Sequence, residues 1–347
     1  TINKSTDYFN TKLYTGNGGT QTITGIGHQP DWVWFKTRSA TSHMLQDAVR
    51  GTTKFIESNT TTGDQTSSDG ISSFNSDGYA IGDNGRLNSN GTSMVSWNWK
   101  ANGQGSSNTD GSINTTYTSA NTTSGFSIST YTGTGSAATV GHGLGAVPKM
   151  IIVKNLSASG DWMVYHQSIG NDHRLIFNTT SAKQDNPVWN DTTPTSSVWS
   201  MNDNGDANGS GSNYVAYCFA EKQGFSKFGS YVGNGSATDG AFIYTGFVPA
   251  FVICKKTSGT DNWMMFTNKI GSSTDSTSGF NIHSRIIEAN GSGAEQSVGT
   301  DQGLDFVSNG FKIREDNANL NGSGATYIYM AFAEAPLVGS NNVPATA

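Results

Sequence analysis

Residues 148–154 read PKMIIVK, and variants of this stretch occur twice more, as PDWVWFK at 30–36 and PAFVICK at 249–255. In each copy a proline begins a mostly apolar run, and a lysine follows six positions later. A run that is apolar on both faces is typical of a central strand in a sheet that is covered on both sides. Three copies in one chain indicate an internal repeat, and the repeat determines the fold to be expected.

Other positions recur around these anchors. Upstream of each copy a tyrosine opens a Gly-rich turn of the form YTGNG, YTGTG or YVGNG, at Tyr14, Tyr131 and Tyr231. Downstream, the second and third copies carry Trp162 and Trp263, where the first copy has His43. Because the two tryptophans recur, packing in the core is the stronger interpretation for them.

A nine-residue pattern, D-N-x-x-x-N-x-x-G, also occurs three times without a gap, at 83–91, 203–211 and 316–324. Its repeated positions are Asp83, Asn88 and Gly91, then Asp203, Asn208 and Gly211, then Asp316, Asn321 and Gly324. Asp and Asn oxygens at alternating positions resemble a calcium loop. However, the first copy has a single carboxylate, and no copy ends in the Glu that would bind calcium through both oxygens. We therefore interpret the pattern as a structural hairpin turn, in which Asp and Asn bond backbone amides and Gly adopts positive φ.

The segments after these loops, MVSWNW, YVAYCF and YIYMAF, alternate with a period of two and predict half-buried strands. One face of each carries large apolar side chains: Val95, Trp97 and Trp99; Val215, Tyr217 and Phe219; Ile328, Met330 and Phe332. The last strand of every copy is therefore expected to contribute to a core.

Units of roughly a hundred residues with many short strands fit a β-sandwich better than a propeller blade. We predict an all-β fold of three tandem β-sandwich repeats, of jelly-roll or concanavalin-like type. The predicted divisions are repeat one at 1–103, a Gly/Ser/Asn/Thr-rich linker at 104–124, repeat two at 125–225, repeat three at 226–338 and a tail at 339–347. Repeats two and three join directly and are expected to dock rigidly, whereas the flexible linker leaves repeat one looser.

Composition excludes several classes of function. Only 34% of residues are hydrophobic and 13% charged, with 43 glycines, which favours short strands joined by tight turns. The net charge of −6, without a basic stripe, argues against nucleic-acid binding. No apolar run is long enough to predict a membrane helix, and the polar start TINKSTDYFN predicts no signal peptide.

No motif indicates a catalytic, metal or cofactor site, since the chain lacks a zinc-binding histidine pair, a G-x-S-x-G elbow and a P-loop. A glycan depolymerase stays open as a minor alternative, because paired carboxylates have no spacing signature. Cys218 and Cys254 occupy non-equivalent strand positions, which excludes a repeated disulfide. Buried free thiols are favoured over a single bridge between repeats.

The stretches GFSISTYTGTGSAATVGHGLGAVPKMIIVKN, WMVYHQSIG and GATYIYMAFAEAP resemble a repeat found in structural proteins of tailed bacteriophages, many of them marine. Proteins with that repeat are usually labelled tail fibre or hypothetical virion protein. The resemblance implies a location on the virion surface, at the tail fibre or the capsid exterior, with other virion proteins as partners. It brings no catalytic or ligand residue with it.

The leading functional hypothesis is a tail-fibre or appendage module that binds host-surface polysaccharide or another receptor, with a homotrimer left open. Trp189 and Asp191, in the loop-like segment NPVWNDTTPT peculiar to repeat two, are the predicted ligand-binding residues. An aromatic ring packs on the apolar face of a sugar while polar groups bond its hydroxyls. The alternative for Trp189 is a plug for the end of the sandwich. The second functional hypothesis is a capsid decoration protein, head fibre or tail spacer that binds no receptor.

Overall fold

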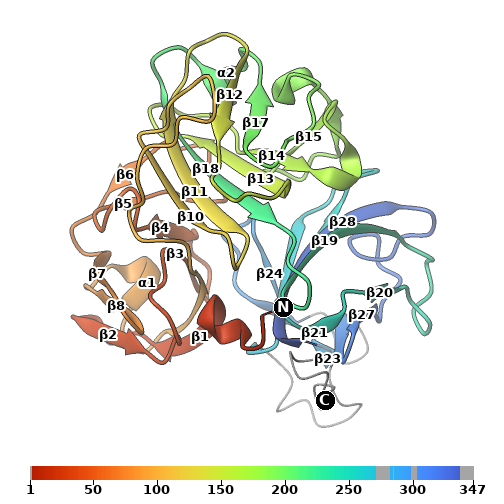
Figure 1. Cartoon of the computed structure of the whole chain (residues 1–347). Coiled ribbons are helices and arrows are strands. Elements are labelled where there is room, and N and C mark those ends of the chain that lie inside the picture. The colour runs from red at the N-terminus through yellow and green to blue at the C-terminus, as the bar shows by residue number, and fades with distance from the viewer. Residues whose placement is uncertain (1, 271–281, 284, 298–302, 337–347) are drawn as a thin grey trace.

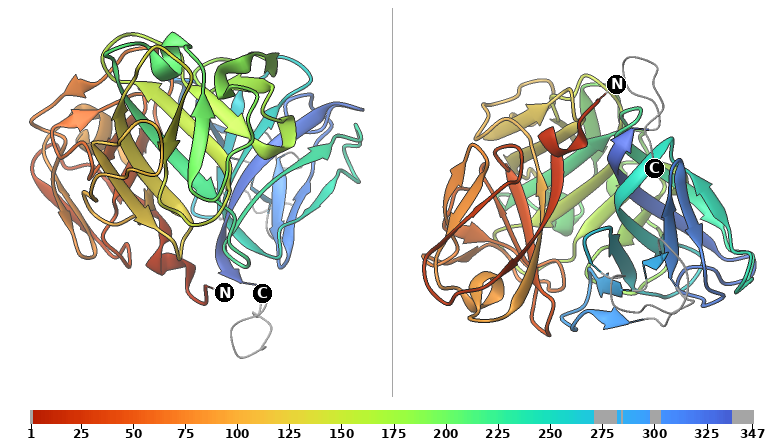
Figure 2. Two further views of the ribbon diagram at one scale, coloured as in Figure 1. Left: turned by 45° about the horizontal axis from the view of Figure 1, so that its top comes forward. Right: turned by 90° about the horizontal axis from the view of Figure 1, so that it is seen from below.

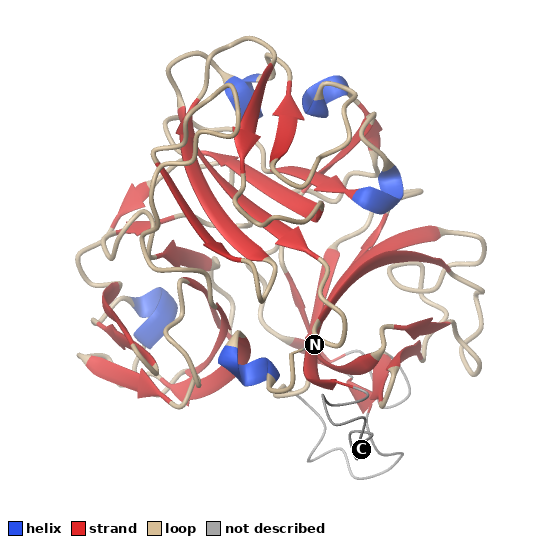
Figure 3. Cartoon of the chain, viewed as in Figure 1, coloured by secondary structure: helices blue, strands red, loops and turns tan. Residues whose placement is uncertain are grey.

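The structure is a computed structural model that describes residues 2–270, 282–283, 285–297 and 303–336. Strands dominate it, as the red arrows of Figure 3 show, and the predicted all-β class is confirmed. Five short helices occur within the described ranges: η1 (Ser5–Asp7), α1 (Gly85–Asn88), η2 (Gln167–Ile169), η3 (Pro187–Trp189) and α2 (Gly205–Asn208).

Each repeat contributes a larger antiparallel sheet, and the strand order corresponds from repeat to repeat. Repeat one has the order β1-β9-β3-β4, formed by β1 (Phe9–Thr15), β9 (Ser93–Trp99), β3 (Trp32–Thr37) and β4 (Met44–Asp47). Repeat two has the order β10-β11-β18-β13-β14-β15-β16, formed by β10 (Tyr117–Asn121), β11 (Phe126–Thr132), β18 (Asn213–Ala220), β13 (Pro148–Asn155), β14 (Met163–His166), β15 (His173–Ile176) and β16 (Gln184–Asp185). Repeat three has the order β19-β28-β21-β22-β24-β25, formed by β19 (Ser226–Val232), β28 (Thr326–Pro336), β21 (Phe247–Lys256), β22 (Trp263–Thr267), β24 (Arg285–Glu288) and β25 (Gln296–Ser297). The proline-anchored strands β3, β13 and β21 are interior strands, as predicted.

A smaller sheet covers one face of each larger sheet. In repeat one it is β2 (Gln21–Thr24), β8 (Gly78–Ile81) and β7 (Ile71–Asn75), and a further pair, β5 (Lys54–Phe55) and β6 (Gln65–Thr66), continues the larger sheet beyond β4. In repeat two it is β12 (Ala138–Gly141) and β17 (Val198–Met201). In repeat three it is β20 (Phe242–Tyr244), β27 (Gly310–Ile313), β26 (Leu304–Val307) and β23 (Ile282–His283). A separate hydrophobic cluster fills the space between the two sheets of each repeat.

The opposite faces of the three larger sheets meet in one common cluster, which we call the shared core. Figure 1 shows the three lobes around this centre, and Figure 2 shows the same arrangement from two further sides. The largest contributions from the interior strands are Trp32, Trp34, Trp97 and Trp99 from repeat one; Met150, Ile152, Tyr217 and Phe219 from repeat two; and Phe251, Ile253, Met330 and Phe332 from repeat three. The Trp32 ring stacks on Tyr217 with ring centroids 4.4 Å apart, and Phe9 stacks on Phe332 at 5.1 Å.

The predicted period-two faces of the last strands do point into this core, but the strands are not half-buried. Their other faces are also buried, because the smaller sheets cover them. Ser96 and Asn98 of β9, for example, are fully buried on that second face, where Tyr79 donates a hydrogen bond to the Ser96 hydroxyl at 2.7 Å. Alternation of polar and apolar residues misleads here because a buried polar residue that is hydrogen-bonded is tolerated.

The repeated tryptophan position links each repeat to the one before it. Trp162 of repeat two donates from Nε1 to the Glu57 carbonyl of repeat one at 3.2 Å. Trp263 of repeat three likewise donates to the Ile176 carbonyl of repeat two at 3.2 Å. Both tryptophans are buried in the shared core, which confirms the packing interpretation.

His43 closes this series into a ring. Its Nδ1 accepts from Trp34 Nε1 at 2.7 Å, so the ring proton is on Nε2, which donates to the Glu288 carbonyl of repeat three at 3.0 Å. Burial lowers the pKa of His43 to about 3, which keeps the imidazole neutral as this pairing requires. Arg38 adds a bidentate ion pair with Glu295 across the same junction. Repeat one is therefore held on both sides, and the prediction that it is looser is wrong.

The lysines of the anchoring motif strengthen two of these junctions. Lys154 donates from Nζ to the carbonyls of Thr61 in repeat one and Gly160 in its own repeat, both at 2.8 Å. Lys255 donates to the carbonyl of Thr180 in repeat two at 3.0 Å. Burial lowers the pKa of each lysine to about 8, so both amines are charged donors below that pH. Lys154 and Lys255 are thus buried connectors, not surface charges, whereas the buried Lys36 donates only within repeat one.

The segment 104–124 is not a flexible linker. Its second half contains β10, which adds an edge strand to the larger sheet of repeat two. Its first half lies along β12, where Ile113 pairs with Val140 and donates from its backbone to Thr139 at 3.0 Å. Side chains of Ser107, Asn108 and Thr115 within the segment bond its backbone groups, an ability that composition alone did not reveal.

Replacing Trp32 by Ala is expected to lower the free energy of unfolding by about 3–5 kcal/mol, because the missing ring leaves a void in the shared core where Trp32 packs on Tyr217 of repeat two. Differential scanning calorimetry should still show one transition at a lower midpoint, since the three repeats share a core. The matched control is Val232→Ala, at an exposed side chain, which should change stability by no more than about 0.5 kcal/mol. Separate transitions for the repeats would contradict the shared core.

Candidate functional site

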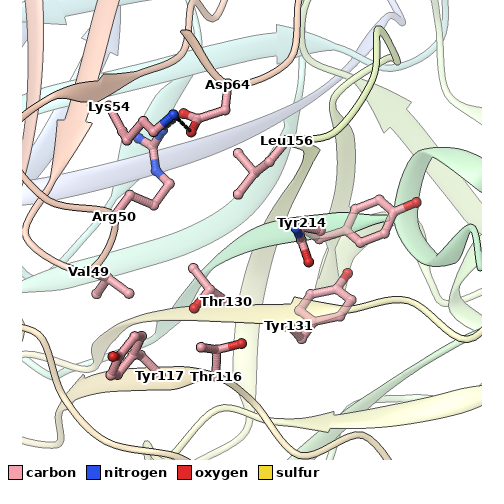
Figure 4. A pocket seen from close by; sticks show the side chains of 11 residues that line it. Val49, Arg50, Lys54, Asp64, Thr116, Tyr117, Thr130, Tyr131, Leu156 and Tyr214 are labelled. Carbon is pink, nitrogen blue, oxygen red and sulfur yellow. Dashed lines mark hydrogen bonds and ion pairs between the residues drawn. The ribbon is translucent and has the colours of Figure 1, made fainter. Parts of the chain in front are cut away.

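A cavity of about 340 Å³ opens to the surface between repeats one and two, and Figure 4 shows the side chains around it. Repeat one supplies Val49, Arg50, Lys54 and Asp64. The 104–124 segment and repeat two supply Thr116, Tyr117, Thr130, Tyr131, Leu156, Asn213 and Tyr214. The two walls are fixed relative to each other because Asp64 donates from its backbone to the Leu156 carbonyl at 2.8 Å.

The repeat-one wall is a chain of paired charges. Arg50 donates from Nε to Asp47 at 2.6 Å and from Nη1 to Asp64 at 2.7 Å, and its side chain is only 4% exposed. Burial opposes the charge of Arg50, but the neighbouring Asp47, Tyr217 and Asp64 outweigh it and raise the pKa of the guanidinium above its ordinary value. Arg50 is therefore a permanent positive charge, and its ion pairs with Asp47 and Asp64 neutralise it within the wall.

Lys54 is the outermost cation of this wall, with its side chain 40% exposed. Its amine lies 3.5 Å from Asp64 and donates to the Thr66 hydroxyl at 2.9 Å. An ammonium group has three donors, so Lys54 retains capacity to bond a ligand in the cavity. Asp64, 16% exposed, likewise retains acceptor capacity beside its bonds to the two cations.

The opposite wall offers hydroxyls and aromatic surface. Thr116 and Tyr117 lie at the start of β10, and Thr130 lies opposite Tyr117 on the neighbouring β11. The hydroxyls of Tyr131 and Tyr214 instead point away, since they donate to the carbonyls of Ala207 and Gly205 at 2.7 and 2.6 Å. Tyr117 is therefore the tyrosine whose ring faces the cavity from the same side as the threonines (Figure 4).

Apolar rings beside a few convergent polar groups are typical of a small-molecule binding site, and the volume lies in the usual range. Neutralised charge pairs and hydroxyls suit a polar, hydroxylated ligand better than a strongly charged one. Within the described ranges no group of three His, Cys, Asp or Glu side chains could hold a metal ion. Among the same residues, no helix is long and apolar enough to cross a membrane.

The predicted ligand residues do not form part of this cavity. Trp189 is 1% exposed and donates from Nε1 to the His173 carbonyl at 3.1 Å. Its ring packs edge-on against Tyr165 and Trp199, so it is the plug of the alternative interpretation and presents no face to a sugar. Asp191 is exposed two residues later, on a left-handed turn with φ of 44°. Trp189 therefore offers no platform for a ligand, because η3 fills the place of a third strand beside the two strands of this smaller sheet. Ligand binding by Asp191 stays a prediction.

A family model described as Domain of unknown function (DUF7483) matches residues 4–336. The chain belongs to the DUF7483 family. The match spans all three repeats as one domain, in agreement with the shared core. No curated protein and no solved structure matches the chain significantly.

The repeated D-N-x-x-x-N-x-x-G loops of the DUF7483 chain are structural, and their central asparagine explains the repetition. Asn208 is fully buried; its Oδ1 accepts from the Thr134 backbone at 2.8 Å, and its Nδ2 donates to the carbonyls of Ser136 and Asn202. Asn88 and Asn321 make the equivalent bonds in their own repeats. The buried amide thus joins the Gly-rich tyrosine turn to the end of the smaller sheet.

The remaining pattern positions have different roles. The glycines Gly91, Gly211 and Gly324 adopt φ of 69°, 73° and 71°, the left-handed conformation that the turn requires. The aspartates Asp83, Asp203 and Asp316 are exposed. The loop is not a hairpin, however, because it connects β8 to β9, β17 to β18 and β27 to β28, which belong to different sheets. Strand spacing along the sequence could not distinguish a hairpin from a crossing between sheets.

Three further buried groups each occur in one repeat only. Cys218 and Cys254 are free and buried, and burial raises the pKa of the Cys254 thiol to about 12. Glu315 is 2% exposed, and neither carboxylate oxygen has a hydrogen-bond partner. Burial, with smaller contributions from Asp316 and Asp261, raises the pKa of Glu315 to about 7. Gly82 and Asn202 hold the equivalent place in the other repeats, so an acid is not required there.

The sequence reasoning missed Lys54, Asp64 and Tyr117. Tyr117 is the only aromatic residue between 104 and 124, which is a signal that it packs against something. Lys54 and Asp64 gave no such signal, because only folding brings them close to the cavity residues of repeat two and of the 104–124 segment.

Replacing Asn208 by Ala is expected to lower the free energy of unfolding by about 2–4 kcal/mol, because the change removes three hydrogen bonds made by a fully buried amide. The matched control, Asp203→Ala, removes the exposed first residue of the same loop and should have an effect below about 0.5 kcal/mol. Urea unfolding measures both. Stabilisation by added calcium that Asp203→Ala abolishes would instead support the calcium interpretation.

Replacing Glu315 by Gln is expected to change the pH dependence of stability. The folded pKa of about 7 lies above the ordinary 4.5, so the folded state holds the proton longer and stability falls as pH rises from about 4.5 to 7. Glu315→Gln should remove this fall and stabilise the chain above pH 7 by up to about 3 kcal/mol. Urea unfolding at a series of pH values measures the difference, and Asp203→Asn, at the exposed equivalent of Asp316 in repeat two, is the control. Equal slopes for wild type and Glu315→Gln would show that the acid titrates normally.

Proposed function

We propose that the chain is a bacteriophage virion-surface module that binds a host-surface glycan in the cavity between repeats one and two. The resemblance to phage tail-fibre repeats supports the location, as a tail-fibre or appendage component. The single observation that carries the binding role is the cavity, whose walls combine the Tyr117 ring with the Lys54–Asp64 pair and unengaged threonine hydroxyls.

A sugar fits this chemistry in two respects. The ring of Tyr117, with Val49 and Leu156, provides an apolar surface for the face of a pyranose. Lys54 can donate to a sugar hydroxyl and Asp64 can accept from one, while Thr116 and Thr130 can do either. Since the charges are already paired, a neutral glycan needs no compensating charge of its own.

The same proposal includes the finer architecture, three tandem β-sandwich repeats of jelly-roll or concanavalin-like type. It is supported by the corresponding strand orders and by the separate cluster between the two sheets of each repeat. Repeats that close around a shared core form a compact body, which displays the cavity rigidly and suits a binding module.

The second candidate is a structural role, as a capsid decoration protein or head fibre. It is favoured by the burial of nearly all large aromatic side chains, including every tryptophan. A spacer gains less support, because three repeats arranged around one centre do not extend a shaft as repeats in a line would.

Binding is tested by applying the purified chain to an array of bacterial capsular and O-chain polysaccharides. Tyr117→Ala is expected to weaken binding to the recognised glycan by about tenfold or more, since ring contacts of about 1.4 kcal/mol correspond to that factor. Tyr117→Phe, which keeps the ring, should retain most of the affinity.

The matched control is Val232→Ala, which removes an exposed apolar side chain that lies neither in the cavity nor on β20. A loss with Val232→Ala but not with Tyr117→Ala would place binding on another surface. If no polysaccharide binds and antibodies to the chain label the capsid without blocking adsorption, the structural role replaces the proposal.

A further inference from the structure

The smaller sheet of repeat three ends in an edge strand unlike its counterparts. Phe242 and Tyr244 of β20 are 50% and 57% exposed, among only four large hydrophobic residues exposed in the described part of the chain. They alternate with the buried Ile243 and therefore share one face of the strand. The counterparts in repeat one are Thr22 and Thr24, so the aromatic pair is not demanded by the repeated fold.

The ladder with β27 fixes where the backbone groups of β20 point. Ile313 donates to Ala241, and Thr245 donates to Asn309, both at 2.9 Å. Hydrogen-bonded pairs alternate in an antiparallel ladder, so the N–H and C=O groups of Phe242 and Tyr244 point away from β27. β20 is the last strand of its sheet, and no hydrogen bond within the described ranges occupies this outer edge. In Figure 1 it lies at the margin of the molecule.

In repeat two the equivalent edge, that of β12, is covered by another segment of the chain. Thr139 holds the position equivalent to Phe242, and both of its outward groups are satisfied by the 104–124 segment. Ile113 donates to the Thr139 carbonyl at 3.0 Å, and Thr139 donates to the Ser112 hydroxyl at 2.9 Å. Repeat three has no insertion before it, because repeat two runs directly into β19.

We propose that β20 pairs with β20 of a second copy of the chain, so that the protein forms a twofold dimer through this edge. An antiparallel pair centred on Ile243 places Phe242 opposite the partner's Tyr244, and the reverse. Both are positions whose backbone groups point outward, so each pair exchanges two hydrogen bonds and the edge is complementary to itself.

The side chains favour the same arrangement. Phe242 lies on the same face as the partner's Tyr244, and aromatic cross-strand pairs stabilise antiparallel strands. The strand carries no charge or proline to discourage pairing, unlike most open edges. Gly310, which lies opposite Tyr244 in the sheet, has no side chain to cover its ring. This dimer is independent of the glycan cavity, which lies between repeats one and two.

Sedimentation equilibrium of the full chain tests self-association. A three-residue edge is short, so the expected dissociation constant is on the order of 10–100 µM. Phe242→Thr, which introduces the residue of the other two repeats, removes the ring but keeps the N–H and should weaken the dimer by about tenfold. Phe242→Pro removes both and should abolish the dimer. Proline is tolerated at the first residue of an edge strand, and circular dichroism verifies that the variant is folded.

Register is tested by cross-linking. The double variant Phe242→Cys, Tyr244→Cys places thiols opposite each other, with Cα atoms about 5.5 Å apart, and should form a disulfide-linked dimer. Phe242→Cys alone should not, because its opposite residue is Tyr244. The native thiols of Cys218 and Cys254 are buried and do not interfere.

A monomeric wild type at all concentrations overturns the proposal. Equal weakening by Phe242→Thr and Phe242→Pro also overturns it, because the rings would then act without strand pairing, as they would in stacking on a glycan. A dimer that survives Phe242→Pro assigns the interface to another surface.

Discussion

Burial of one face of each larger sheet against the other two is the constraint on which the whole molecule depends. A sandwich usually buries only the surfaces between its own two sheets, and its outer faces are polar. Here the larger sheets are apolar on both faces, so a single repeat would expose large aromatic side chains such as Trp32 and Phe251. The only way to remove this surface from water is to bring the three sheets together.

The junctions around the shared core show a common plan with local substitutions. Where repeats two and three donate from a tryptophan to the preceding repeat, repeat one uses His43 and accepts from Trp34 on its other ring nitrogen. A histidine in repeat one and tryptophans in repeats two and three thus donate a ring N–H to the neighbouring repeat from equivalent positions around the shared core. The junction between repeats three and one also carries the Arg38–Glu295 ion pair.

Features that bear on function are those in which one repeat departs from the other two. The cavity exists because the 104–124 segment supplies Thr116 and Tyr117 at the first junction. The same segment covers the edge of β12, whereas β20 has no such cover and carries exposed aromatic residues instead. Identical repeats would give a symmetric body with three equal surfaces; insertion and substitution distinguish these surfaces. Repetition therefore builds the scaffold, and departure from repetition creates the sites proposed for ligand and partner.

Sequence alone determined the all-β class, the threefold repetition, the buried central strands and the packing role of Trp162 and Trp263. These follow from local patterns, because strand period and turn residues are properties of neighbouring positions. Sequence could not show that three apolar faces meet in one core, since a buried face looks the same whether its partner is its own repeat or another. It assigned Trp189 to a surface and 104–124 to a linker because composition reports polarity but not which hydrogen-bond partners folding supplies. Only the tertiary structure brought Lys54, Asp64 and Tyr117 together, because their proximity depends on two repeats packing at a fixed angle around the shared core.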